Sequence, residues 1–368
     1  MGAHDTLRGR YLAPAAGLRW GPRHARRLLS VAGSACAAGP VASSLPAAVN
    51  IDVSDACNLA CRVCSRELGY DRRQRAFFPL GDFERLVAEL RPAYLLLSGY
   101  GEPLLHRALP ALVAAGAATG AQVALVTNGT LLDADRGAAL RGAGLARLKV
   151  SLDAARPEPF AKMREGGDLD VILDNVRAFV AAPGPTQVEV QMVLSQDNLD
   201  ELLPMLALCA GLGLQPNFLG MFTYGGQPGF VERALPGPDP AVLSVLEAGV
   251  AEAEARGMRR SEGALRQIIR GLDPSVSRAP CYMPWYQVTI STDGEVYACC
   301  HHSVGGKSLG NAVQHGFAAV WNGEAAQGFR ARLRADRRAD PVCAACRHDD
   351  SPLEPFLAAG RRLPAGLW

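Results

Sequence analysis

The sequence predicts an α/β fold, a partial TIM-type (β/α)6 barrel followed by a small C-terminal α+β domain. Two observations carry this prediction. Between about residues 48 and 222, short apolar runs alternate with helix-like runs, several of which end at glycine, and parallel strands joined by crossover helices produce this alternation. From about residue 281, a hairpin pattern and a long amphipathic run replace it.

Six apolar runs of strand length define the predicted barrel. They cover residues 48–53, 93–99, 122–128, 147–153, 188–195 and 214–222. Such runs are typical of parallel strands that are covered on both faces. Six strands instead of eight predict an open barrel, and in barrels of this type the chemistry gathers in the loops that follow the strands.

Helix-like runs lie between these strands, at 82–90, 107–118, 170–182 and 199–213. A Gly- and Pro-rich stretch, 223–240, then predicts a linker or lid, and helical runs follow at 241–258 and 263–272. We expect a basic N-terminal extension, the barrel, a helical connector, the small domain and a C-terminal tail. Their expected bounds are 1–47, 48–235, 236–280, 281–350 and 351–368.

The small domain is expected to begin with a β-hairpin. Its strands are predicted at 285–292 and 295–300, with a two-residue turn at Asp293-Gly294. One amphipathic helix is expected over 316–336. Strands followed by a helix, without alternation, are typical of a small α+β unit.

Composition limits the classes of partner. The chain has 368 residues, 49% of them hydrophobic, and a net charge of +2. The charge is too small to indicate nucleic acid or an anionic membrane as a partner, and no apolar run is long enough to span a bilayer. Arg26 and Arg27 precede an Ala-rich run, which loosely resembles an export signal. We favour a basic amphipathic segment packed on the domain, and a cytoplasmic location.

Ten cysteines cluster in a way that favours metal ligation in a reducing compartment over a disulfide scaffold. Cys57, Cys61 and Cys64 lie in one loop after the first strand, with the spacing C-x3-C-x2-C. Four thiolates complete the ligation of a [4Fe–4S] cube, so three leave one iron open. An open coordination position distinguishes a reactive metal site from a structural one. Zinc is the alternative, but no nearby His supplies its fourth ligand.

This loop resembles the signature of the radical S-adenosylmethionine (SAM) superfamily, apart from Val63, where the family often has an aromatic residue. The resemblance covers roughly residues 48–350. It implies that the open iron binds SAM and that SAM is cleaved to a 5′-deoxyadenosyl radical, which abstracts hydrogen from a substrate carbon. The protein would orient the cofactor and exclude water.

Further motifs resemble the family in their order along the barrel. The run from Ser98 to Pro103 resembles its glycine-glycine-glutamate motif, which implies that Gly99, Gly101 and Glu102 receive the SAM amino group. The other implied SAM contacts are Asn128, Ser151, Arg164, Gln191 and Met192. The alternatives are a surface helix position for Arg164 and core packing for Met192.

A second cysteine group comprises Cys281, Cys299, Cys343 and Cys346. It resembles the twitch domain, the shortened form of the SPASM extension of radical SAM enzymes. Because no cysteine follows Cys346, the resemblance implies one auxiliary [4Fe–4S] cluster, fully ligated, with a role in electron transfer. A four-cysteine zinc site is the alternative.

Cys300 adjoins Cys299 and is a candidate hydrogen-atom donor to a substrate radical, which would imply epimerisation; a thiol packed near the cluster is the alternative. His301 and His302 follow Cys300 directly. They are candidate bases or substrate contacts, and solvated loop histidines are the alternative. Further aromatic candidates near the mouth of the site, which either hold substrate or pack the core, are Tyr224, Tyr282 and Trp285.

These patterns predict a radical SAM enzyme that dehydrogenates or epimerises a carbohydrate or aminocyclitol in natural-product biosynthesis, such as that of an antibiotic. A single auxiliary cluster with this cysteine spacing resembles that of the aminocyclitol dehydrogenases, which favours oxidation. One alternative is the modification of a ribosomally made precursor peptide. Another is a non-catalytic iron- or zinc-binding protein. Expected partners are the substrate and a flavodoxin, ferredoxin or reductase as electron donor.

Overall fold

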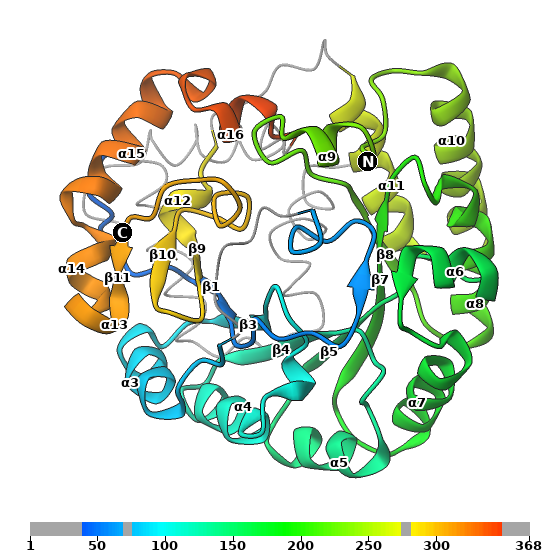
Figure 1. The fold of residues 1–368 in the computed structure, drawn as a ribbon, viewed down its shortest axis with the longest axis horizontal. Helices are drawn as coiled ribbons and strands as arrows, with labels where there is room; N and C mark the ends of the chain where they lie inside the picture. Colours follow the sequence, from blue (N-terminus) through cyan, green and yellow to red (C-terminus); the bar gives the residue numbers. More distant parts are fainter. Residues whose placement is uncertain (1–38, 69–75, 274–280, 348–368) are drawn as a thin grey trace.

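The computed structural model describes residues 39–68, 76–273 and 281–347. Six parallel strands form an arc, and helices cover its outer side (Figure 1). The strands, neighbour to neighbour, are β1 (Ala48–Asp52), β3 (Tyr94–Ser98), β4 (Gln122–Thr127), β5 (Arg147–Ser151), β7 (Gln187–Leu194) and β8 (Pro216–Gly220). All six predicted strands and the partial-barrel fold are therefore confirmed.

The helices on the outer side join consecutive strands. They are α3 (Leu80–Leu90), α4 (Leu109–Ala118), α5 (Ala134–Gly142), α6 (Pro157–Met163), α7 (Leu169–Ala181) and α8 (Leu202–Gly211). The sequence did not predict α5, whose pattern is only weakly amphipathic. Its start is nevertheless marked, because the Asp133 side chain accepts a hydrogen bond from the Arg136 backbone N–H.

The two faces of the sheet differ in chemistry. Val150 of β5 lies beside Ile172 of α7 and pairs in register with Val190 of β7, so these residues face the helices. Because neighbouring residues of a strand face opposite sides, the remaining positions form an inner face. That face carries Asn50, Ser98, Lys149, Ser151, Gln191 and Asn217, all half-buried.

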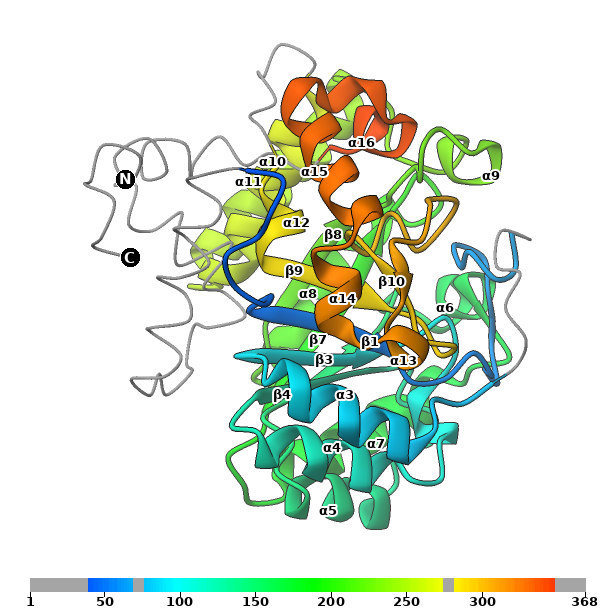
Figure 2. The ribbon, with the colours of Figure 1, turned by 90° about the vertical axis from the view of Figure 1, so that its left-hand side faces the viewer.

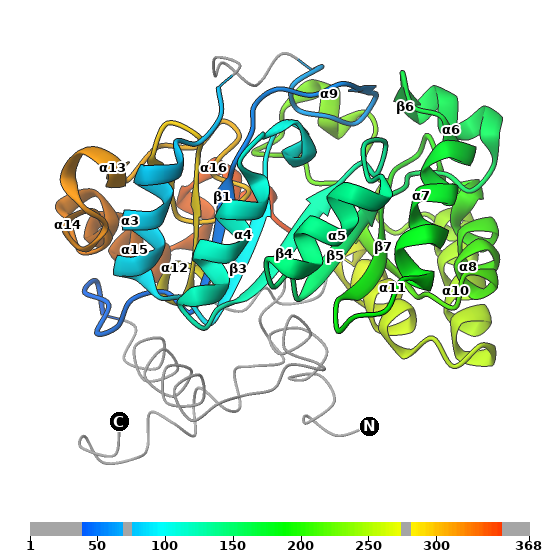
Figure 3. The ribbon, with the colours of Figure 1, turned by 90° about the horizontal axis from the view of Figure 1, so that it is seen from below.

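Two helices predicted as a connector cover the end of the sheet. They are α10 (Pro240–Ala255) and α11 (Arg259–Leu272), and with α8 they gather beyond β7 (Figure 3). The Ser261 hydroxyl of α11 donates a hydrogen bond to the Pro216 carbonyl of β8, 2.6 Å away. None of the helices described spans enough apolar residues to traverse a bilayer.

The predicted C-terminal hairpin is present, but it extends the barrel sheet. β9 (Gln287–Ile290) pairs in parallel with β1, and β10 (Glu295–Tyr297) returns antiparallel. β11 (Gly310–Asn311) completes the sheet. The turn is longer than predicted: Ser291 N–H donates to the Glu295 carbonyl, which leaves a three-residue loop between them.

The single helix expected over 316–336 is two helices, α14 (Phe317–Trp321) and α15 (Glu324–Ala335). At the break, the Asn322 side chain exchanges two hydrogen bonds of 2.9 Å with the backbone of Ala42. A tertiary contact therefore accompanies the interruption of a run that is amphipathic throughout its length.

The described part of the N-terminal extension packs on the C-terminal elements (Figure 2). Trp285 of α12 (Met283–Tyr286) donates its indole N–H to the Gly39 carbonyl at 2.9 Å, and Trp321 of α14 donates to Ser44 at 2.8 Å. The basic run with Arg26 and Arg27 lies outside the described residues. The predicted boundary at residue 281 stays a prediction, because strands on both sides of it share one sheet.

Candidate functional site

The loop that carries the first three cysteines follows β1 and is held at both ends. Its short strand β2 (Ala60–Cys61) pairs with β6 (Arg164–Glu165), so that Cys61 lies opposite Arg164. At its start, the carbonyl of Ser54 accepts from the Gly101 N–H at 2.9 Å. The loop is therefore clamped between the turn after β3 and the end of α6.

Gly99 and Gly101 make this clamp possible. A Cβ atom on Gly99 would lie 2.4 Å from the Ser54 carbonyl oxygen, and one on Gly101 would lie 2.1 Å from that of Ala56. Both distances are shorter than side chains tolerate, and the obstacle is backbone. The close approach that the glycines allow is thus made by the cysteine loop itself.

Glu102 is buried and ties two strand ends together. Its Oε1 accepts from the Leu104 N–H at 2.9 Å and the Thr127 hydroxyl at 2.6 Å, and its Oε2 accepts from the Asn128 N–H at 2.7 Å. Burial raises the pKa of this carboxyl above its usual range. A carboxylate has about four acceptor positions, so one remains for a further donor.

The Asn128 side chain also reaches the cysteine loop. Its amide donates to Asn58 Oδ1 at 3.0 Å, and Asn58 in turn donates to the Thr130 hydroxyl at 2.8 Å. Asn58 was missed by sequence reasoning, although it directly follows Cys57. This contact adds a third anchor to the loop.

Arg164 is buried beside Cys61, which excludes the surface position considered for it. Its Nη2 lies 2.8 Å from Asp153 Oδ2, and its Nη1 lies 3.9 Å from the Cys61 sulfur. Burial raises the pKa of Cys61 to about 12, and the charge of Arg164 opposes this rise. The arginine therefore supplies a fixed positive charge next to a candidate thiolate ligand.

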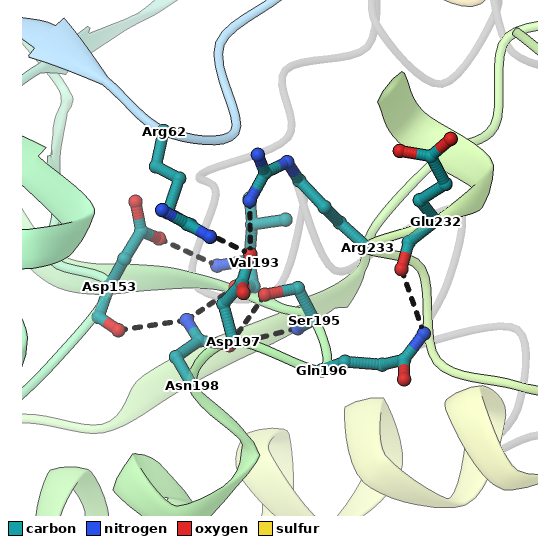
Figure 4. Close-up of polar contacts among 9 residues, drawn as sticks. All are labelled: Arg62, Asp153, Val193, Ser195, Gln196, Asp197, Asn198, Glu232 and Arg233. Atoms are coloured by element: carbon teal, nitrogen blue, oxygen red, sulfur yellow. Dashed lines mark hydrogen bonds and ion pairs between the residues drawn. The ribbon is translucent and has the colours of Figure 1, made fainter. Parts of the chain in front are cut away.

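The loop after β7 connects these elements to α9 (Pro228–Val231) (Figure 4). Asn198 donates to the Asp153 carbonyl at 2.8 Å, which fixes the residue that pairs with the buried arginine. Asp197 binds Arg62 at 3.2 Å and Arg233 at 2.7 Å. Because Arg62 lies between two of the loop cysteines, this acidic residue links the cysteine loop to the segment after α9.

Of the two candidates on β7, the structure brings one to the inner face. Gln191 is half-buried and pairs in register with Ser151 of β5. Met192 is fully buried in the hydrophobic core on the helix side. The prediction of Met192 as a SAM contact is therefore corrected to core packing, since adjacent strand residues face opposite sides.

The second cysteine group comes together from three separate segments. Cys281 precedes α12, Cys299 follows β10, and Cys343 and Cys346 lie in and after α16 (Pro341–Ala345). Burial and the charges of neighbouring thiols, including Cys281 and Cys346, raise the pKa of Cys299. The pKa of Cys343 is raised by burial, by Asp340 and by the thiols of Cys281 and Cys346. The four thiols thus share one electrostatic neighbourhood.

The distances between ligand atoms indicate whether a single metal ion could be held. Within the described ranges, one set of three His, Cys, Asp or Glu side chains has its ligand atoms all within 4.8 Å of one another: His302, Asp340 and Cys343. A tetrahedral zinc ion would hold its sulfurs about 3.8 Å apart. Among the described residues, no three sulfur atoms of either cysteine group all lie within 4.8 Å of one another, so neither group is arranged in this structure as a closed zinc site.

Two histidines flank the second group, and both are buried, unlike the solvated loop residues considered for them. The His301 ring lies 3.9 Å from the Phe222 ring, centroid to centroid. Burial acts to lower the pKa of His301, but Cys346 and Cys300 raise it to about 10. His302 Nε2 lies 3.4 Å from the Cys343 sulfur.

Cys300 is half-buried, and its carbonyl accepts from the Ser303 hydroxyl at 2.8 Å. That hydroxyl lies 3.2 Å from the phenol of Tyr100, in the glycine turn after β3. Tyr224, in the loop after β8, packs on the same apolar cluster as Val63 of the first cysteine loop, and its ring lies 6.1 Å from that of His301. Tyr282 and Trp285 are fully buried in the core, which is the packing role considered for them.

Two family models match the chain. The model described as the radical SAM superfamily matches residues 51–209, and the SPASM model, described as an iron-sulfur cluster-binding domain, matches residues 281–347.

Two relatives of this chain share one name. GTP 3',8-cyclase of Xanthomonas axonopodis pv. citri (strain 306) is 30% identical over 339 residues, which covers 85% of this chain and 96% of the relative. The enzyme of the same name from Xanthomonas campestris pv. campestris (strain B100) is 31% identical over 333 residues, covering 85% and 94%.

Similar solved structures share the fold at low sequence identity. SuiB of Streptococcus suis, bound to the precursor peptide SuiA, has a TM-score of 0.64 and 15% identity, and the match covers 90% of this chain and 75% of SuiB. BtrN in complex with AdoMet and 2-DOIA has a TM-score of 0.50 and 15% identity, covering 83% and 94%. At this identity the likeness concerns the fold alone.

Proposed function

The chain belongs to the radical SAM superfamily, and on that premise we propose that it oxidises a hydroxylated small molecule of the carbohydrate or aminocyclitol class. Its cofactors are a [4Fe–4S] cluster with SAM and an auxiliary cluster, as the sequence predicted. Held by Cys57, Cys61 and Cys64, the first cluster with SAM would supply a radical for the abstraction of hydrogen from a substrate carbon. The observation that carries the proposal is the position of the loop after β8: Tyr224 packs on the same apolar cluster as Val63 of the first cysteine loop, and its ring lies 6.1 Å from that of His301 beside the second group.

Cys57, Cys61 and Cys64 are the proposed ligands of the SAM-binding cluster. The three anchors of their loop support this assignment, because a reactive site needs ligands held in place. Arg164 offsets the negative charge of thiolates in this buried setting.

Seven residues are the proposed SAM contacts or their supports. The buried Nε of Arg164 has no hydrogen-bond partner among the described residues, and it suits the SAM carboxylate. Ser151 and Gln191 lie on neighbouring strands at the inner face, and they are proposed to contact the ribose or the adenine of SAM. The backbone around Gly99 and Gly101, and the remaining acceptor position of Glu102, suit the SAM amino group, while Asn128 holds the loop.

Cys281, Cys299, Cys343 and Cys346 are the proposed ligands of the auxiliary cluster. When all four iron corners have protein ligands, none is left open for substrate. Such a centre suits an electron acceptor: a substrate alcohol would lose a hydrogen atom, then an electron and a proton, to give a ketone. A flavodoxin or ferredoxin is the proposed source of the electron that starts turnover.

Epimerisation is a second candidate reaction, with Cys300 as the hydrogen donor. The observation that favours it is the position of this half-buried residue, whose carbonyl accepts from Ser303, which in turn contacts Tyr100 in the glycine turn of the first site. Turnover in D2O separates the two reactions. Deuterium in a product of unchanged oxidation level supports epimerisation and contradicts the dehydrogenase assignment.

A purine nucleotide is a second candidate substrate, because proteins named GTP 3',8-cyclase match nearly their whole length at about 30% identity. The alternative substrate, a precursor peptide, is supported only by the similarity of the fold to that of SuiB bound to its precursor peptide. Family membership favours an enzyme over the non-catalytic metal-binding alternative.

The decisive experiment is anaerobic reconstitution followed by product analysis. About eight irons per chain are expected from two four-iron clusters. With dithionite and SAM, the protein is offered deuterated 2-DOIA, related cyclitols and GTP. Deuterium transfer into 5′-deoxyadenosine from a cyclitol supports the proposal, whereas transfer from GTP alone favours the nucleotide. If no 5′-deoxyadenosine forms, the enzymatic proposal fails.

A further inference from the structure

His302, in the segment after β10, contacts two of the proposed ligand residues of the auxiliary cluster. Its backbone N–H donates to the Cys299 carbonyl at 3.1 Å, and its ring Nε2 lies 3.4 Å from the Cys343 sulfur of α16. The side chain is only 4% exposed. Burying a polar ring nitrogen is costly unless it makes a hydrogen bond, so the contact with the sulfur needs an explanation.

The surrounding chain holds the His302 ring in this position. The Phe329 ring of α15 meets it edge-on, with 4.9 Å between the ring centroids. The Gly306 N–H donates to the His302 carbonyl at 3.1 Å. A Cβ atom on Gly306 would lie 2.7 Å from His302 Nδ1 and 2.4 Å from the His302 carbonyl oxygen. A side chain at that position would therefore displace the ring, and glycine allows Nε2 to reach Cys343.

Two acceptors lie near Nε2, and the distances distinguish them. Asp340 Oδ1 is 3.5 Å away, which is longer than an ordinary N–H···O hydrogen bond. The same oxygen accepts from the Cys343 N–H at 3.0 Å. The Cys343 sulfur, at 3.4 Å, is within hydrogen-bond range because sulfur is a larger atom than oxygen. A thiolate that binds iron has no proton to donate, so the imidazole N–H is the donor in this pair.

We propose that His302 is a positioning residue of the auxiliary cluster: its ring N–H donates a hydrogen bond to the Cys343 thiolate and raises the reduction potential of the cluster. Hydrogen bonds to sulfur are among the factors that set such potentials. Reduction adds negative charge, which a donor stabilises and the nearby Asp340 carboxylate opposes. A higher potential suits an acceptor of the electron that the oxidation releases, so the inference rests on the proposed function.

The test is a redox titration of the full-length, reconstituted protein, in which EPR spectra follow both clusters. Addition of SAM identifies the cluster that binds it, and the potential of that cluster is the internal control. H302L removes the donor, and it should lower the auxiliary potential by about 59 mV, a tenfold change in the equilibrium constant of a one-electron couple.

Two amide variants form a matched pair. H302Q should restore most of the potential, because a glutamine amide reaches the position of Nε2. H302N carries the same amide on a side chain one carbon shorter, so its potential should stay as low as that of H302L.

D340N should change the auxiliary potential in the opposite direction. An asparagine oxygen still accepts from the Cys343 N–H, but the negative charge is gone, so the potential should rise. The rise should be smaller than the fall in H302L, because the Asp340 side chain is 33% exposed and its charge is partly screened.

Iron analysis verifies that each variant carries about eight irons per chain. An auxiliary potential that is equal in H302L and wild type overturns the inference, and so do equal potentials in H302Q and H302N. Loss of the second cluster from all three His302 variants would assign a structural role to this residue and overturn the inference as well. One zinc ion with about four irons per wild-type chain would do the same. SAM cleavage by the wild-type protein is measured separately, and its absence would defeat the proposed function whatever the potentials are.

Discussion

The two cysteine groups are built in different ways. The first lies within eight consecutive residues, from Cys57 to Cys64, and hydrogen bonds from the loops after β3, β4 and α6 hold it. The second draws on segments between residues 281 and 346, and α16 reaches the segment after β10, where His302 Nε2 lies 3.4 Å from the Cys343 sulfur. A local spacing specifies the first group, and the tertiary fold assembles the second.

This difference predicts how each group fails. The first depends on a few close backbone contacts at one loop, so local changes there remove SAM chemistry. The second depends on long-range packing, so its loss damages turnover and stability while the first group persists. The following changes are ordered from the largest expected effect to the smallest.

C61A should abolish SAM cleavage, because it removes a proposed ligand of the cluster that binds SAM. C343A should spare SAM cleavage in the absence of substrate but stop substrate turnover. Each should lower the iron content from about eight to about four per chain. Iron analysis and chromatography of 5′-deoxyadenosine measure both effects.

C209A is the control for these variants, because Cys209 is fully buried in α8, away from both groups. It should retain all of the iron. SAM cleavage by C61A, or loss of iron in C209A, would contradict the assignment of the ligands.

R164M should destabilise the protein by about 3 kcal/mol, since it leaves the buried carboxylate of Asp153 without its partner. R164K keeps the charge but loses Nε, so it should retain most of the stability and weaken SAM binding roughly tenfold. Urea unfolding and equilibrium dialysis with labelled SAM measure the two effects. Equal SAM affinity in R164K and wild type would remove Arg164 from the SAM site.

G101A should displace the cysteine loop and cost about 2 kcal/mol, because its Cβ would meet the Ala56 backbone at 2.1 Å. G263A is the matched control: Gly263 is exposed within α11 with nothing near its Cβ position, so alanine there should stabilise the helix by up to about 1 kcal/mol. Thermal unfolding compares them. Equal effects would show that the loop does not need this glycine.

Y100F should have the smallest effect, about 1 kcal/mol, through loss of its contact with Ser303. This contact joins the glycine turn of the first site to the hairpin of the second. A double-mutant cycle with S303A measures the coupling free energy between the two residues. Additive effects would mean that the contact does not couple the two sites.

Sequence patterns predicted the six barrel strands because short apolar runs are a local signal. They could not separate Gln191 from Met192, since the face of a strand that a residue occupies depends on the register with β5 and β8. They also joined α14 and α15 into one helix, because the contact between Asn322 and Ala42 is long-range. The sequence patterns also could not show that backbone atoms of the cysteine loop crowd Gly99 and Gly101, because those contacts are long-range as well.

The sequence by itself determined the family, the cofactors and the spacing of the first three cysteines, because those features depend on residues close together in the chain. Only the tertiary structure decided which groups share one site. It placed Arg164 beside Cys61, brought four distant cysteines into one neighbourhood, and folded the loop after β8 so that Tyr224 lies between the two groups. Such neighbourhoods arise from strand pairing and packing between residues that lie far apart in the chain, 103 positions in the case of Cys61 and Arg164, and no local pattern records them.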